Sequence, residues 1–135
     1  MRIATIAMLV GVLPVLPLAA TTGEEDKIVI NRLNATDFEV IQGMNFGAAE
    51  YWCGAATYIE RRTGQSELTP IYVKRPRGPS LTMSGRKGVV FSTSTAGIPA
   101  QGTSRQTLTV QVRGAMLKSV QARRYCRDAF TRSTK

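Results

Sequence analysis

The chain contains no histidine among its 135 residues, and this absence removes the commonest general base of enzymes. Neither a Ser-His-Asp triad nor a Cys-His pair can be assembled, and no His-based metal site can form. We therefore predict no catalytic residue, no metal and no cofactor. A carboxylate or Ser/Thr enzyme stays open as an alternative, because such a site is recognised only by its geometry. Its candidate carboxylates are Asp37, Glu39, Glu50 and Glu60.

Cysteine is scarce as well, with only Cys53 and Cys126. Their positions differ by 126 − 53 = 73, so they do not form the Cys-x-x-Cys motif of redox proteins. A nucleophilic cysteine usually needs a neighbouring base such as histidine. The even count predicts one structural disulfide. In the chain-entropy account, closing a loop of this length stabilises the fold by about 4 kcal/mol.

Long apolar runs are confined to the N-terminus. Arg2 precedes an apolar stretch, Ile3–Leu13, and Pro14 and Pro17 follow it before Ala20. A membrane-spanning helix needs about 20 apolar residues, and prolines interrupt a helix. The pattern is typical of a signal peptide cleaved after Ala20, and the alternative is an uncleaved anchor or a buried N-terminal helix. We expect a periplasmic or secreted protein with no transmembrane span in its mature form. Its environment would be one in which disulfides persist.

Acidic residues are nearly absent from the second half of the mature chain. Residues 21–67 hold four basic and eight acidic residues, whereas residues 68–135 hold thirteen basic residues and one acidic residue. This asymmetry indicates an anionic partner or an acidic surface within the protein itself. We expect residues 21–135 to form one small domain, with loose ends at 21–27 and 131–135.

Periodicity predicts two helices. In residues 45–64 the apolar positions share one face, and Gly64 is placed to end the helix. The members of that stripe are Ala49, Trp52, Ala56 and Ile59. A shorter helix is expected over residues 119–130. There Ala122, Tyr125, Cys126 and Ala129 share a face, which makes a bridge to Cys53 plausible.

Strands are predicted where the period changes to two. Residues 37–41 form a short strand, and residues 71–74 and 88–92 form a hairpin. The clearest alternation lies in residues 108–112. The fold class expected is α+β. It is a small two-layer domain with a mainly antiparallel sheet of 3–4 strands, packed by one long helix and one short C-terminal helix.

The most basic segment is "YVKRPRGPSLTMSGRK", residues 72–87. Its prolines and glycines predict the exposed loop of the hairpin over residues 74–87. The candidate anion-binding residues are Lys74, Arg75, Arg77, Arg86 and Lys87. We expect a non-catalytic binding protein of the cell envelope or exterior that contacts phospholipid, lipopolysaccharide, an acidic polymer or nucleic acid. The alternatives are a hydrolase-type enzyme and a structural protein whose basic face only keeps it soluble.

Overall fold

The computed structural model describes residues 24–99 and 108–129, together with the isolated Gly11. The predicted signal peptide, apart from Gly11, lies outside these residues, and so do its predicted cleavage site and residues 131–135. Within the described ranges, no helix is both long enough and apolar enough to span a bilayer.

Five antiparallel strands form one sheet in the order β1-β2-β4-β3-β5. Their bounds are Ile30–Arg32 (β1), Asp37–Ile41 (β2), Pro70–Pro79 (β3), Lys87–Ser92 (β4) and Met116–Lys118 (β5). The predicted α+β class with an antiparallel sheet is confirmed, and the expected number of 3–4 strands is wrong. The prediction missed β1, which is too short to show a period; it forms a hairpin with β2, and Ile30 pairs with Val40.

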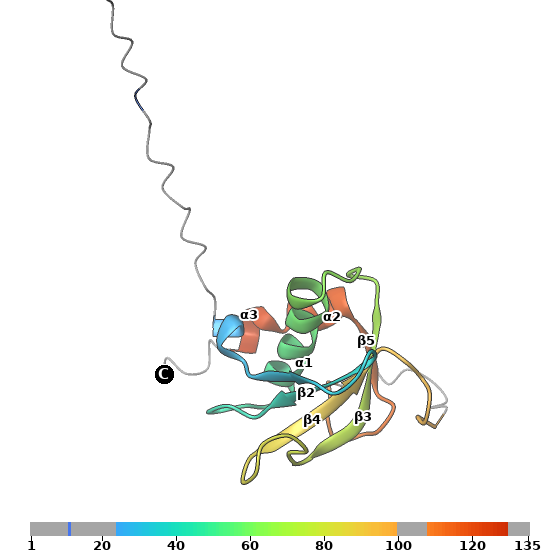
Figure 1. Cartoon of the computed structure of the whole chain (residues 1–135). Helices are drawn as coiled ribbons and strands as arrows, with labels where there is room; N and C mark the ends of the chain where they lie inside the picture. Colours follow the sequence, from blue (N-terminus) through green and yellow to red (C-terminus); the bar gives the residue numbers. More distant parts are fainter. Residues whose placement is uncertain (1–10, 12–23, 100–107, 130–135) are drawn as a thin grey trace, which may run out of the picture.

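The helices of the described residues all cover one face of the sheet (Figure 1). The main helix α1 (Ala48–Thr57) begins where the Glu50 carboxylate accepts a hydrogen bond from the Gly47 N–H at 2.8 Å. It continues as a π-helical turn η2 (Tyr58–Arg62) and ends before Gly64, which has a φ of 66°. Only glycine adopts such a φ easily. The C-terminal helix is broken at Tyr125 into α2 (Ser119–Arg124) and α3 (Cys126–Ala129), where one short helix was expected.

The core lies between α1 and the sheet. The four residues of the predicted apolar stripe, Ala49, Trp52, Ala56 and Ile59, are all buried. The burial is not confined to one stripe, however, because every α1 residue from Ala49 to Thr57 is buried. Trp52 packs against Phe91 of β4 with ring centroids 5.0 Å apart. Its indole N–H donates to the carbonyl of Thr109 at 3.0 Å, so this large side chain is buried without an unpaired donor.

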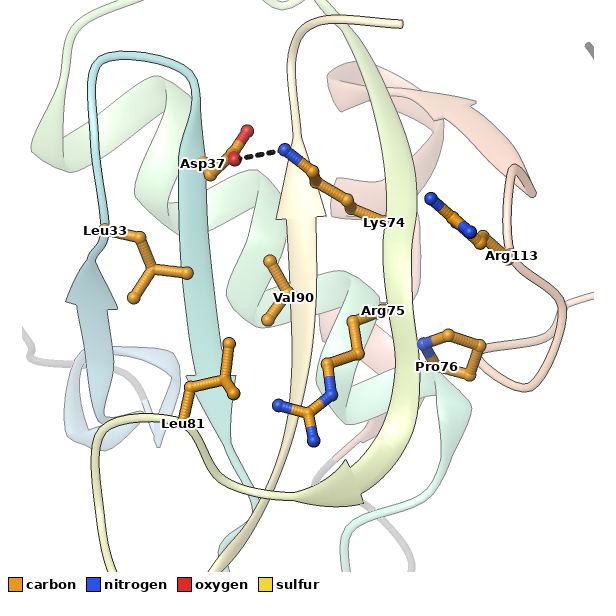
Figure 2. A pocket seen from close by; sticks show the side chains of 8 residues that line it. All are labelled: Leu33, Asp37, Lys74, Arg75, Pro76, Leu81, Val90 and Arg113. Atoms are coloured by element: carbon orange, nitrogen blue, oxygen red, sulfur yellow. Dashed lines mark hydrogen bonds and ion pairs between the residues drawn. The ribbon is translucent and has the colours of Figure 1, made fainter. Parts of the chain in front are cut away.

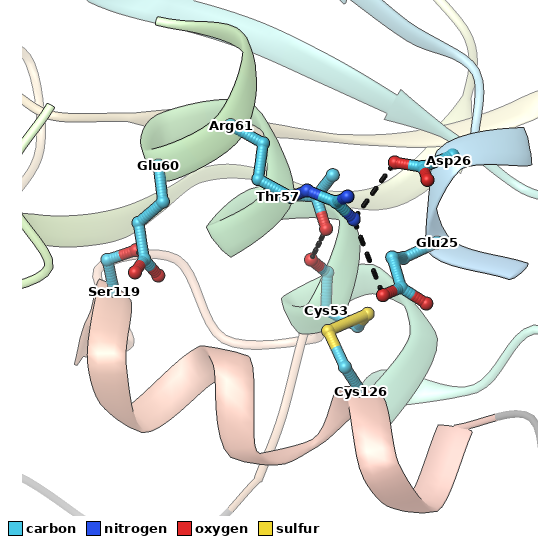
Figure 3. Close-up of a disulfide and its surroundings, with 8 residues drawn as sticks. All are labelled: Glu25, Asp26, Cys53, Thr57, Glu60, Arg61, Ser119 and Cys126. Atoms are coloured by element: carbon cyan, nitrogen blue, oxygen red, sulfur yellow. Dashed lines mark hydrogen bonds and ion pairs between the residues drawn. A yellow bond between two sulfur atoms is a disulfide. The ribbon is translucent and has the colours of Figure 1, made fainter. Parts of the chain in front are cut away.

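The predicted disulfide joins Cys53 of α1 to Cys126 of α3, with their Cα atoms 4.7 Å apart (Figure 3). Close by, Arg61 forms ion pairs with Asp26 at 3.0 Å and Glu25 at 3.4 Å. These two carboxylates belong to a 3₁₀ turn, η1 (Glu24–Lys27), in a segment that the sequence predicted to be loose. The disulfide therefore fastens the C-terminal helices to α1, and the Arg61 ion pairs fasten this N-terminal turn to η2.

The alternating segment 108–112, predicted as the clearest strand, is not a strand. It and the residues after it meet β3 at separate points, where Arg77 N–H donates to the Val110 carbonyl at 3.1 Å and Gly114 N–H donates to the Val73 carbonyl at 2.7 Å. Between these points the chain forms bends and a turn, in which Ala115 N–H donates to the Val112 carbonyl at 3.2 Å. The edge strand β5 starts only at Met116.

Candidate functional site

Two irregularities in β3 determine which side chains reach the face of the sheet opposite the helices. Val73 pairs with Phe91 and Arg75 pairs with Val90, so Lys74 is an extra residue in the ladder, and a second shift lies between Arg75 and Gly78. Successive residues of a regular strand point to opposite faces. The bulge instead allows Lys74 and Arg75 to project to the same side (Figure 2).

An open hollow of about 430 Å³ lies on this face of the sheet. Figure 2 shows its two sides: Leu33 and Leu81 lie over β1 and β2, whereas the cationic side chains come from β3 and the segment that precedes β5. The hollow is lined by Leu33, Asp37, Lys74, Arg75, Pro76, Leu81, Val90 and Arg113. It therefore combines an apolar wall with a cationic wall, and ligand pockets usually pair an apolar lining with a few polar groups in this way.

Asp37 forms an ion pair with Lys74. The Lys74 Nζ lies 2.5 Å from Asp37 Oδ2, and the Asp37 side chain is only 6% exposed. Burial alone would raise the pKa of Asp37. Hydrogen bonds to the charged form outweigh burial and hold this pKa well below its usual range. The four donors are the side chains of Lys74, Ser92, Asn34 and Thr36.

Arg75 is not neutralised in this way. Its Nη1 atom is shielded from solvent and has no hydrogen-bond partner within residues 24–99 and 108–129. A buried donor without a partner is unfavourable by about 1–3 kcal/mol. The Arg75 side chain also lines the hollow, and a planar guanidinium suits carboxylate and phosphate groups.

The loop between β3 and β4 is held against the sheet by Glu39. This carboxylate is 1% exposed and accepts hydrogen bonds from two backbone and two hydroxyl donors: Leu81 N, Thr82 N, Ser80 Oγ and Thr82 Oγ1. The Glu39 side chain passes so close to the backbone of β4 that position 88 requires a glycine, because a Cβ there would lie 2.7 Å from Glu39 Oε1. The contact places Leu81 at the wall of the hollow.

The structure separates the five predicted anion-binding residues. Lys74 and Arg75 line the hollow. Arg77 Nε donates to Gln42 Oε1 at 2.9 Å, and Arg86 Nη2 donates to the Gln42 carbonyl at 2.9 Å, so both are bound just after the end of β2. Lys87 is exposed at the start of β4.

The boundaries of the predicted basic loop are wrong. β3 extends to Pro79 and the connection to β4 is only residues 80–86, so the first basic residues of the segment belong to a strand. Arg113 was not among the predicted site residues, although it lines the hollow. The sequence did hold one sign of irregularity, since Pro76 lies within the basic run and a proline inside a strand marks a bulge or an edge.

All four candidate catalytic carboxylates are engaged. Asp37 and Glu39 have the partners described above, and Glu50 caps α1. Glu60 accepts a hydrogen bond from Ser119 Oγ at 2.8 Å and pairs with Arg123. Within the described part of the chain, no group of three His, Cys, Asp or Glu side chains is arranged to hold a metal ion.

A second hollow, of about 470 Å³, lies between the β1–β2 turn and the π-helical turn η2. Its two arginines are occupied by backbone carbonyls: Arg62 Nη2 donates to Ile28 O at 2.8 Å and Arg32 Nε donates to Asn34 O at 3.1 Å. Among the described residues, the unpartnered buried donor belongs to the first hollow, which makes the sheet face the stronger candidate.

No protein-family model, no curated protein and no solved structure matches this chain.

Proposed function

We propose that this protein is an exported, non-catalytic binding protein that contacts an anionic partner at the hollow on the open face of its sheet. The observation that carries the proposal is the Arg75 guanidinium, which the bulge directs to this face and whose Nη1 atom has no partner in the described part of the chain. Among the lining residues, three cations stand against one carboxylate, a net charge of 3 − 1 = +2. A cationic concave surface raises the local concentration of anions.

Part of the basic half is matched internally, which supports a local site rather than a diffuse one. Arg123 pairs with Glu60 and Glu67, and Lys74 pairs with Asp37. In each of these ion pairs a cation of the second half meets a carboxylate of the first half. Arg75, in the cationic wall of the hollow, then carries the binding.

The test compares two variants that lose equal charge. Arg75→Gln with Arg113→Gln removes two cations from the hollow, and Arg86→Gln with Lys87→Gln removes two from the loop end. On immobilised heparin, we expect the hollow variant to elute at clearly lower salt than the loop variant, and all binding to weaken as salt rises. Thermal unfolding checks that both variants stay folded. Exposed substitutions usually alter stability by less than about 0.5 kcal/mol each, and Arg75→Gln also removes the unpartnered donor, which should not destabilise the fold.

Equal elution of the two variants would contradict the proposal. It would favour the alternative in which the basic surface only keeps the protein soluble. No contact in the described residues favours the hydrolase alternative, because the candidate carboxylates are engaged in hydrogen bonds and ion pairs.

A further inference from the structure

We infer that the anionic partner of the hollow is an acyl carboxylate, a small amphiphile with one carboxylate and an apolar chain. This inference rests on the proposed function, because it names the ligand of the same site. It follows from the division of the hollow into a cationic wall and an apolar wall (Figure 2).

The cationic wall suits a single anionic group. Lys74 is already paired with Asp37 at 2.5 Å, and Arg113 donates to the carbonyl of Gly97. Arg75 lines the same wall, and no described residue pairs with its Nη1 atom. A carboxylate can accept two parallel hydrogen bonds from one guanidinium. The ligand group expected here is therefore a monoanion.

The apolar wall suits a chain of methylene groups. Leu81 is 57% exposed and Leu33 is 36% exposed, although both line the hollow, and Val90 lies between them and Arg75. Each methylene that leaves water gains about 0.8 kcal/mol, which corresponds to an affinity gain of up to about fourfold. A highly charged polymer keeps its bound water and would leave the apolar wall in contact with that water. An acyl chain would cover it.

The volume of the hollow is large enough for a small amphiphile. Ligand pockets span roughly 300 to 1000 Å3. The hollow, at about 430 Å³, lies at the low end of that range, so a short or medium acyl chain fits it. Leu81 also has a fixed position, because its backbone N–H is bound to the buried Glu39. The apolar wall is therefore already in place before a ligand enters.

The experiment is a calorimetric titration of the full mature chain with acetate, butanoate, hexanoate and octanoate, each below its micellar concentration, and with octan-1-ol. We expect affinity to rise by a few-fold with each two-carbon step, and octan-1-ol to bind at least tenfold more weakly than octanoate.

Variants test the two walls separately. Arg75→Gln should weaken the binding of every carboxylate in the series. Leu81→Ser should remove the dependence on chain length and leave heparin elution unchanged. Leu68→Ser is the matched control, because Leu68 is 62% exposed and lies outside the hollow.

Two results would overturn the inference and leave the proposed function standing. In the first, the hollow variant loses heparin retention but octanoate binds no better than acetate. In the second, the protein sediments with vesicles containing phosphatidylglycerol, depends there on Arg75, and binds no free carboxylate of any length. The second result would identify the site as a membrane contact. Failure of the proposed function is distinct, since the hollow and loop variants would then elute together.

Discussion

At the scale of single residues, the cationic side chains near the bulge have different roles although they are close in the sequence. Lys74 neutralises the buried Asp37, Arg75 faces the hollow, and Arg77 binds Gln42. Arg77 also lies close enough to Tyr51 to affect the pKa of its hydroxyl group. Burial raises the pKa of Tyr51, and Arg77 opposes that shift. Composition could predict that this segment is basic. It could not predict which cation lacks a partner, since that depends on carboxylates far away in the sequence.

Asp37→Asn tests the pairing with Lys74. The pKa of Asp37 is lowered in the folded state, so its carboxylate stabilises the fold fully above its unfolded pKa of about 3.9. This contribution disappears progressively as the pH falls below about 4. We expect Asp37→Asn to lower the free energy of unfolding by about 1–3 kcal/mol at pH 7. The difference from the wild type should shrink at pH 3. Urea unfolding at the two pH values measures it.

Glu67→Gln is the control for this prediction. Glu67 pairs with Arg123, and both side chains are about half exposed. Exposed ion pairs contribute about 0–1 kcal/mol, so this variant should change little at either pH. A loss in Asp37→Asn that is the same at pH 7 and pH 3 would mean that the carboxylate charge is not what stabilises the pair.

At the scale of elements, the helices were predicted better than the strands. The stripe of α1 is a local pattern within one helix, and Gly64 marks its end clearly. The bulges of β3 depend on the pairing of distant residues, Val73 with Phe91 and Arg75 with Val90, and no local period reveals them. The prediction over residues 108–112 was also wrong, because their alternation is typical of a strand but they meet β3 only at separate points. The hollow was missed because it exists only once the bulge has formed.

Gly54→Ala tests how closely α1 approaches the sheet. A Cβ at Gly54 would lie 2.9 Å from Val40 Cγ1 and 3.1 Å from Ile28 Cγ2, both in buried residues. Alanine favours a helix by up to about 1 kcal/mol over glycine, whereas overpacking a core is unfavourable by about 1–3 kcal/mol. We expect overpacking to dominate, with a net loss of about 1 kcal/mol in chemical unfolding.

Gly78→Ala is the matched control for Gly54. At Gly78 the nearest atom to an added Cβ is the Pro76 carbonyl oxygen at 3.7 Å, an ordinary contact. Its stability should stay within about 0.5 kcal/mol of the wild type. An increase in the stability of Gly54→Ala would show that the sheet moves away from α1 without penalty.

At the scale of the whole molecule, the charge asymmetry of the sequence has two structural consequences. Some cations of the second half pair with carboxylates of the first half, as in Lys74–Asp37 and Arg123–Glu60. Others lie at the face of the sheet that the helices leave uncovered. The disulfide fastens α3 to α1 on the opposite face. The molecule therefore has one face that is covered and cross-linked and another that carries the hollow.

The most direct test of this account is to map the binding surface by NMR. The ¹⁵N-labelled mature protein would be titrated with a short heparin oligosaccharide at low salt. We expect the largest amide shift changes around the hollow, at Leu33, Arg75, Leu81, Val90 and Arg113, with smaller changes at Gly85, Arg86 and Lys87. The largest changes at those three loop residues, or changes spread evenly over all basic residues, would contradict a binding site on the open face of the sheet.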